Sequence, residues 1–375
     1  MKTLLSGALN PHFEALPEYL SAALSRLGHE VTLFDHRDFL LPGRLRRRWG
    51  ALDRFDRGRI NARLLGLVRR VRPDLLIVNQ GTVLTRATIE RARDLGVRCV
   101  NWFSDFPAEF EAGLQIADAY DAFFIGSSYA AARHREAGRL RSFWLPFGCD
   151  PERHRPDPEE PAAARRDAGD APAIVFVGSH YPERQVLLRF LRGLPVGVWG
   201  PGWERAADDP LVRPMIRGGA LRPSAWRRLY ARCRVALNIH YGAFGPIEAS
   251  GDLASTRVFE ILACGACQVV NRQGDVLRLF RDGEHLSLFS GGEEMRVRVE
   301  EALRDEGRRL AMARAGRSEA LARHTYEHRA RVLADPAATG FVPADAAAGP
   351  TARPQAPEAA SAWRPARSGT TGGPR

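Results

Sequence analysis

Residues 251–267, GDLASTRVFEILACGAC, place the carboxylates of Asp252 and Glu260 eight positions apart. The run VFEILA has the apolar spacing of a helix, so a short helix is predicted to begin near Thr256. Glu260 would lie one turn into that helix, where its carboxylate can accept two hydrogen bonds from a vicinal diol. The ribose of a nucleotide offers such a diol.

The start of this helix has the features of a phosphate site. Ser255 or Thr256 can act as its N-cap, and Gly265 suits a left-handed C-terminal cap. The first turn leaves backbone N–H groups unpaired and carries the positive end of the helix dipole, to which Arg257 adds a full charge. A diphosphate with a ribose on one side and a sugar on the other fits this arrangement.

The pattern resembles the nucleotide-sugar signature of GT-B glycosyltransferases, in which an acidic residue, seven residues and a glutamate precede a glycine-containing turn. In the retaining family that the chain is similar to, the first acid touches the donor sugar and the second binds the ribose. The resemblance gives these roles to Asp252 and Glu260. The stretch RVFEILACG is most similar to the CgeB-like branch, named for a spore-maturation protein. LPFGCDPERHRP at 145–156 and HTYEHR at 324–329 extend the resemblance over residues 1–333.

The other half of the donor site is expected after the first strand of the C-terminal half, because open α/β sheets bind ligands beyond strand carboxyl ends. The related pattern has a glycine, a basic residue and then Glu-Lys; here Gly178 is followed by Ser179 and, further on, by Glu183 and Arg184. The guanidinium of Arg184 can hold diphosphate oxygens bidentately, or it forms a surface ion pair. Ser179 replaces the usual basic residue, and Arg257 can compensate.

Three further side chains are candidates for the chemistry. Asp105, in NWFSDFP, can orient or deprotonate an acceptor hydroxyl, or it caps the turn ahead of Pro107. His240 ends a strand of the donor half, where it can touch the sugar or phosphate, or it is a buried capping histidine. His12 lies in the first strand-to-helix loop, which the resemblance places near the donor sugar.

Alternating strand and helix patterns in two halves predict an α/β fold of GT-B type, with two Rossmann-like doubly wound domains facing a cleft. The predicted strands are short apolar runs at 2–8, 29–35, 74–79, 97–103, 122–127, 142–147, 173–178, 196–200, 235–240 and 267–271. The predicted parts are an acceptor-side domain at 1–150, a linker at 151–172, a nucleotide-sugar domain at 173–335 and a disordered tail at 336–375, rich in Ala, Pro, Gly and Ser.

The composition is that of an ordinary globular protein, with 45% hydrophobic and 26% charged residues in 375 and a net charge of +11. Lys2 is the only lysine, so 54 of the 55 basic residues are arginine, which indicates coding bias more than a nucleic-acid partner. Five scattered cysteines and the lack of a targeting segment favour a cytoplasmic protein, or one peripheral to the inner membrane face.

One basic stretch stands out from this background. Residues 44–72 hold eleven arginines and two aspartates, a local charge of +9, with apolar positions near helical spacing. Such a stretch is most often a solvated helix face. It also serves as a contact to an anionic acceptor or membrane surface, and less often to nucleic acid.

Several absences narrow the chemistry. The chain has no Asp-x-Asp triplet, no P-loop and no G-x-G-x-x-G after the first strand, so metal-dependent GT-A, P-loop and dinucleotide functions lose support. Neither the Cys264 and Cys267 pair nor His324 and His328 has the further ligands of a metal site. We therefore expect no metal and no cofactor beyond the donor, with leaving-group charge stabilised by arginines and a helix N-terminus.

The resemblance implies a glycosyltransferase that moves a sugar from a nucleotide-diphosphate sugar to an unidentified acceptor. It also implies anomeric retention, with the departing phosphate helping to deprotonate the incoming hydroxyl. Two alternatives stay open. A sugar-nucleotide epimerase would use the same fold and donor contacts, and a non-catalytic nucleotide or polyanion-binding module would use the arginine-rich face.

Overall fold

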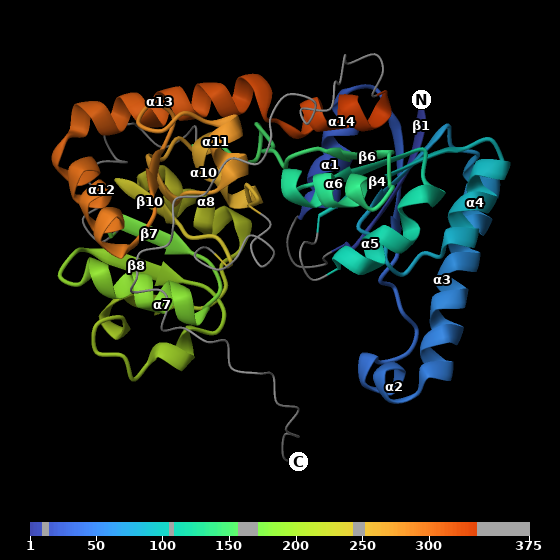
Figure 1. The fold of residues 1–375 in the computed structure, drawn as a ribbon, viewed down its shortest axis with the longest axis horizontal. Helices are drawn as coiled ribbons and strands as arrows, with labels where there is room; N and C mark the ends of the chain where they lie inside the picture. The colour runs from blue at the N-terminus through green and yellow to red at the C-terminus, as the bar shows by residue number, and fades with distance from the viewer. Residues whose placement is uncertain (10–14, 105–108, 157–171, 243–251, 336–375) are drawn as a thin grey trace.

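The computed structural model describes residues 1–9, 15–104, 109–156, 172–242 and 252–335. These residues form two halves, each built on a six-stranded parallel sheet, which confirms the predicted fold class (Figure 1). The predicted catalytic residues His12 and Asp105 lie outside the described residues, as do the middle of the predicted linker and the whole of the predicted tail.

The first sheet has the strand order β2-β1-β3-β4-β5-β6. Its strands are β1 (Lys2–Gly7), β2 (Glu30–Asp35), β3 (Leu75–Asn79), β4 (Arg98–Phe103), β5 (Ala122–Ile125) and β6 (Ser142–Trp144). Its helices are α1 (Leu16–Arg26), α2 (Gly43–Arg48), α3 (Gly50–Val71), α4 (Arg86–Asp94), α5 (Phe110–Ile116) and α6 (Ser128–Glu136).

Successive side chains of a strand point to opposite faces of this sheet, so each strand feeds two cores. Leu4 and Leu76 join the cluster that packs under α3 and α4. Leu5 and Leu75 join the cluster under α1 on the other face. Both faces are apolar because helices cover both, as a buried parallel sheet requires.

The second sheet has the order β12-β11-β10-β7-β8-β9, with all described pairs parallel. Its strands are β7 (Ile174–Val177), β8 (Val196–Trp199), β9 (Ile216–Gly218), β10 (Val235–Asn238), β11 (Gln268–Asn271) and β12 (Ser287–Phe289). Its helices are α7 (Pro182–Leu188), α8 (Pro223–Arg232), α10 (Thr256–Ala263), α11 (Gly274–Leu279), α12 (Gly292–Arg304) and α13 (Glu306–Arg323).

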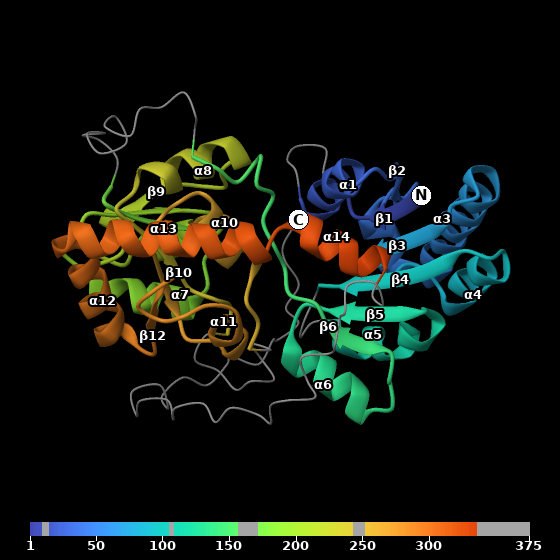
Figure 2. The same cartoon turned by 90° about the horizontal axis from the view of Figure 1, so that it is seen from above.

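The last helix, α14 (Tyr326–Ala334), returns to the N-terminal half and packs on α1, although the predicted division grouped it with residues 173–335 (Figure 2). The chain therefore crosses between the halves twice, and the two crossings are hydrogen-bonded to each other. The Cys149 N–H donates to the His324 carbonyl at 2.9 Å, and the Tyr326 N–H donates to the Cys149 carbonyl at 2.8 Å.

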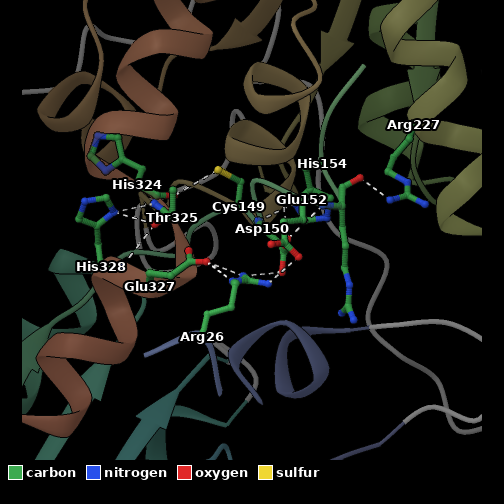
Figure 3. A network of polar contacts seen from close by, with 11 residues as sticks. Arg26, Cys149, Asp150, Glu152, His154, Arg227, His324, Thr325, Glu327 and His328 are labelled. Carbon is green, nitrogen blue, oxygen red and sulfur yellow. Dashed lines mark hydrogen bonds and ion pairs between the residues drawn. The ribbon is translucent and has the colours of Figure 1, made fainter. Parts of the chain in front are cut away.

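A single arginine on α1 fastens both crossings. Figure 3 shows Arg26 directed at acidic side chains of each. Its guanidinium lies 3.0 Å from Asp150 and 3.2 Å from Glu152 on the first crossing, and donates to Glu327 on α14 at 2.6 Å. The N-terminal half is thus held to both connecting segments by charge as well as by apolar packing.

None of the helices in the described ranges has the length and apolar content needed to span a bilayer.

Candidate functional site

A cavity of about 250 Å³ opens where β7 and β10 end, the edge of a parallel sheet at which ligands bind. Its walls are formed by Phe176, Val177, Gly178, Arg184, Asn238, Ile239, His240, Tyr241, Leu253, Ser255 and Arg257. Five of the eight residues predicted for donor binding are among them. The other three, Ser179, Thr256 and Glu260, lie beside the cavity without lining it.

Arg184 joins the two loops that frame this cavity. Its Nε and Nη2 donate to the Ile239 carbonyl at 3.0 and 2.6 Å, and its Nη1 donates to the Ser179 carbonyl at 2.8 Å. The guanidinium also lies 4.8 Å above the ring of Tyr181. Burial lowers the pKa of Arg184 to about 10, so the side chain stays charged at neutral pH.

These contacts use three of the five N–H donors of Arg184, and the remaining donors are on the two Nη atoms. The hydrogen bonds go to carbonyl groups of the loops after β7 and β10. The side chain is therefore fixed in place while it keeps its charge and part of its donor capacity for a ligand in the cavity.

The residue before it, Glu183, was not predicted as part of the site, yet it holds the same two loops together. Its Oε1 accepts a hydrogen bond of 2.7 Å from the Gly242 N–H. Tyr181 and Tyr241 add an edge-on ring contact with centroids 4.8 Å apart. Glu183 belongs to the predicted glycine and Glu-Arg pattern, so the sequence signal was present.

His240 is bound by the protein at both ring nitrogens. Its Nδ1 lies 2.9 Å from Oδ1 of Asn271, and its Nε2 accepts a hydrogen bond of 3.2 Å from the Ser255 N–H. These partners assign the proton to Nδ1. Burial lowers the pKa of His240 to about 4, so the ring is neutral at physiological pH. His240 thus has the contacts of a capping histidine and also forms part of the cavity wall.

Arg257 stands at the start of α10, whose first residue is Thr256 as predicted. Its guanidinium lies 4.6 Å from the ring centroid of Trp226 and forms a 3.0 Å ion pair with Glu260. Ser255, the N-cap residue, makes no side-chain cap hydrogen bond in α10. The positive end of α10 and the charge of Arg257 therefore meet at the cavity.

Asp252, the first acid of the motif, is directed at α11. Its Oδ1 accepts a hydrogen bond of 2.5 Å from the Gly274 N–H, and its carbonyl accepts one of 3.0 Å from the Asp275 N–H. A Cβ on Gly274 would lie 1.8 Å from Asp252 Oδ2, so a side chain at this position would displace the Asp252 carboxylate. The carboxylate caps α11, and Asp252 does not line the cavity.

A buried carboxylate that the sequence did not point to lies next to Asp252. Asp275 is fully buried, and its Oδ2 accepts a hydrogen bond of 3.1 Å from the Ser128 N–H at the start of α6. Burial raises the pKa of Asp275 to about 8. An acid in the first turn of a helix is ordinary in sequence, and only the contact between the two halves makes this one unusual.

Across the described ranges, no group of three or more His, Cys, Asp or Glu side chains could hold a metal ion. Cys264 and Cys267 are buried free thiols. His324 packs against Phe280, and burial lowers its pKa to about 3.

Comparisons with known proteins agree with this geometry. Residues 184–335 match the model of a family described as glycosyl transferase-like, and that segment contains α10 and most of the cavity wall. A comparison with curated protein sequences finds no match. Residues 184–335 are therefore similar in sequence to that family.

Solved structures extend the likeness to the whole fold. Anabaena HepE in complex with UDP-glucose is 14% identical, with a TM-score of 0.62 over 90% of this chain and 100% of that chain. Sucrose-phosphate synthase from Thermosynechococcus elongatus is 12% identical, with a TM-score of 0.64 over 91% and 99%. Trehalose 6-phosphate synthase from Burkholderia multivorans is 13% identical, with a TM-score of 0.57 over 90% and 96%. The chain has the fold of the GT-B glycosyltransferases.

Proposed function

We propose that the protein transfers a sugar from a nucleotide-diphosphate sugar to an acceptor bound between its two halves. The observation that carries the proposal is the meeting of Arg184, Arg257 and the N-terminus of α10 at one cavity beyond β7 and β10. A fixed cation, a second cation and an oriented helix end suit a diphosphate, because all three favour negative charge. The match of residues 184–335 to a glycosyl transferase-like family supports a glycosyl transfer function.

In the proposed reaction the bond between the anomeric carbon and the diphosphate oxygen breaks, and an acceptor hydroxyl forms the new bond. Arg184, Arg257 and α10 stabilise the charge that develops on the departing diphosphate, without a metal or cofactor. The reaction retains anomeric configuration, and a phosphate oxygen receives the proton of the hydroxyl. HepE, a structural neighbour, is described in complex with UDP-glucose, which makes UDP-sugars the first donors to test.

The other predicted roles remain proposals within this function. Glu260 binds the ribose once the donor draws Arg257 toward its phosphates. Asp252, which caps α11 and does not line the cavity, is proposed to contact the donor sugar, and His12 and Asp105 to act on the sugar and the acceptor hydroxyl. We also propose membership of the CgeB-like branch and a cytoplasmic location.

Incubation with UDP-, GDP-, dTDP- and ADP-sugars, without acceptor, tests the proposal. Mass spectrometry is expected to detect selective binding of one donor and slow release of its nucleoside diphosphate, with or without EDTA. Arg184→Ala should lower the rate of release by about 100-fold or more, whereas Arg205→Ala, a change at an exposed arginine of the same half, should leave it unchanged. Conversion of the donor to a different sugar nucleotide would identify an epimerase. Failure to bind any donor would favour a polyanion-binding module.

A further inference from the structure

Residues 40–55 form a projecting hairpin at the side of the N-terminal half. The hairpin comprises the approach to α2, α2 itself and the first turns of α3. At about 1.5 Å per residue the 22 residues of α3 span roughly 33 Å, whereas a six-residue strand spans roughly 20 Å. The helix therefore overshoots the sheet, and Figure 1 shows α2 and the start of α3 standing away from the rest of this half.

The base of the hairpin is tightly anchored, so its tip has a defined shape. Asp56 is fully buried, and its two oxygens accept the backbone N–H groups of Leu40 and Leu41 at 3.0 and 2.9 Å. Arg46 pairs with Asp53 at 3.0 Å and covers the ring of Phe39 at 3.5 Å. Beyond this anchor α2 has no buried residue, and the buried residues of α3 begin at Asp56.

The hairpin exposes large apolar side chains from its base to its tip. Among the described residues, four of the thirteen exposed large hydrophobic side chains fall within residues 40–55. They are Leu40, Leu45, Trp49 and Phe55, with exposed fractions of 64%, 44%, 57% and 61%. Trp49 and Phe55 are the only tryptophan and phenylalanine in that set. A solvated helix face gains nothing from exposing these side chains, so the concentration indicates a contact surface.

The same tip carries unpaired positive charge. Arg44, Arg47, Arg48 and Arg54 are exposed, and none has a carboxylate partner within the described residues. The arginines nearer the anchor differ, because Arg57 pairs with Asp53 and Arg59 with Asp56. Positive charges interleaved with exposed apolar side chains suit a partner that is anionic at its surface and apolar just beneath.

We propose that the projecting hairpin docks on an anionic phospholipid membrane. The arginines bind lipid phosphates, while Trp49, Phe55 and the two leucines enter the boundary between headgroups and acyl chains. Nucleic acid would engage the arginines and could stack on the aromatic rings, but it offers no apolar layer for Leu40 and Leu45. Membrane docking uses every exposed feature of the tip, and it stands independently of the sugar transfer proposed above.

The docking has a consequence for the orientation of the molecule. The segment that leads into the hairpin leaves β2 at Asp35, which pairs with Gly7 at the end of β1. Strand ends on this edge of the first sheet precede the loops predicted to carry His12 and Asp105. A docked hairpin therefore brings the predicted acceptor side of the protein toward the bilayer.

Vesicle flotation with the full chain tests the proposal. The protein should float with vesicles of equal parts phosphatidylglycerol and phosphatidylcholine, and should stay below with phosphatidylcholine alone. Arg47→Glu with Arg48→Glu should lower the partition coefficient at least about thirtyfold, because each arginine near an anionic surface contributes roughly fivefold. Trp49→Ser with Phe55→Ser should lower it at least about tenfold, because apolar burial is lost.

Matched controls separate local effects from general ones. Arg205→Glu with Arg314→Glu makes the same charge change at exposed positions of the other half, and should leave partition within about twofold of wild type, because charges remote from the surface are screened. Leu140→Ser with Val297→Ser removes exposed apolar side chains elsewhere and should also have no effect. Thermal unfolding reports whether each variant is folded.

Three results would overturn the proposal. The first is a wild-type protein that ignores anionic vesicles. The second is hairpin variants that float as well as the controls do. The third is a short nucleic acid that displaces the protein from vesicles and still binds the Trp49→Ser, Phe55→Ser variant, which would identify nucleic acid as the partner.

Discussion

The cavity and the projecting hairpin both depend on arginine, but they hold it in opposite ways. Arg184 and Arg257 are fixed by carbonyls, aromatic rings and a carboxylate in the wall of the cavity. Arg47 and Arg48 lie exposed on a short helix with no carboxylate partner in the described residues. In a chain where 54 of 55 basic residues are arginine, residue type says little about function, and the contacts of each side chain say much more.

This difference has a physical basis. A cation already held in position loses little conformational entropy when a small anion arrives, so it contributes affinity and geometry together. An exposed arginine must give up side-chain freedom for each contact, and it suits a broad surface where many weak contacts add. Substitutions should therefore change the chemistry at the cavity and leave it untouched at the hairpin.

The largest effect is expected from Arg184→Ala. The change removes the charge that is proposed to bind the diphosphate, and it also frees the Ile239 and Ser179 carbonyls beside the cavity. We expect kcat/KM for the sugar nucleotide to fall by about 100-fold or more, or about 3 kcal/mol. Arg184→Lys keeps the charge but loses the fork of donors. Its kcat/KM should lie between those of the wild type and Arg184→Ala.

Steady-state kinetics on both variants, with thermal unfolding alongside, measures this effect. Arg205→Ala is the matched control, because Arg205 is exposed and lies away from the cavity wall. A folded Arg184→Ala protein with wild-type kcat/KM would contradict a role of this arginine in the reaction.

The second prediction concerns Asp275, whose carboxyl group is buried, unlike the acidic side chains on the surface. Burial holds the pKa of Asp275 at about 8, whereas an unfolded aspartate titrates near about 3.9. Between these values the folded protein binds one more proton than the unfolded chain. The contribution of Asp275 to the free energy of unfolding should therefore fall as pH rises, by about 1.4 kcal/mol per pH unit between about pH 5 and 7.

Urea unfolding of wild type and Asp275→Asn at several pH values isolates this contribution. The asparagine oxygen can still accept the Ser128 N–H but cannot titrate. The free energy of unfolding of the variant should depend less steeply on pH, by about 1.4 kcal/mol per pH unit. Equal slopes in the two proteins would show that Asp275 does not hold a proton in the folded state.

The third effect concerns Glu260. This residue lies behind the cavity wall, whereas its partner Arg257 is part of the wall. Glu260→Gln should weaken donor binding by about 1.5 to 3 kcal/mol, the range for a hydrogen bond to a charged group. The structure adds a second consequence, since the variant also loses the 3.0 Å ion pair with Arg257. Calorimetric titration measures the affinity of wild type and variant for the donor and for the free nucleoside diphosphate.

A ribose contact alone would weaken the two ligands equally, because both carry the ribose. Unchanged affinity for both in a folded variant would exclude the ribose role.

Much of the fold was predictable because buried parallel strands are short continuous apolar runs. The predicted run at 173–178 contains β7, and the predicted start of the signature helix at Thr256 is the start of α10. The edge strands β9 and β12 were not predicted, since each has three residues and little pattern. The return of α14 onto α1 was also missed, because it depends on contacts between distant parts of the chain.

The candidate site was predictable only in part, because local motifs indicate some of its residues and packing determines the others. Gly178, Arg184, Ser255 and Arg257 come together at the cavity because local motifs place them at strand ends and at a helix start. The burial of Asp275 and the capping role of Asp252 are set by packing around α11. Local sequence shows which residue types are present, and the packing between elements decides which of them face a ligand.

The smallest effect is expected from Arg47→Glu with Arg48→Glu in the absence of lipid. Both side chains are exposed and have no carboxylate partner in the described structure, so the free energy of unfolding should change by no more than about 0.5 kcal/mol. Donor hydrolysis in solution should equal that of wild type, because α2 does not reach the cavity wall. Denaturant unfolding and hydrolysis rates check this pair of expectations. A loss of hydrolysis without a loss of stability would mean that the hairpin takes part in the reaction itself, and the separation between the two arginine regions would no longer hold.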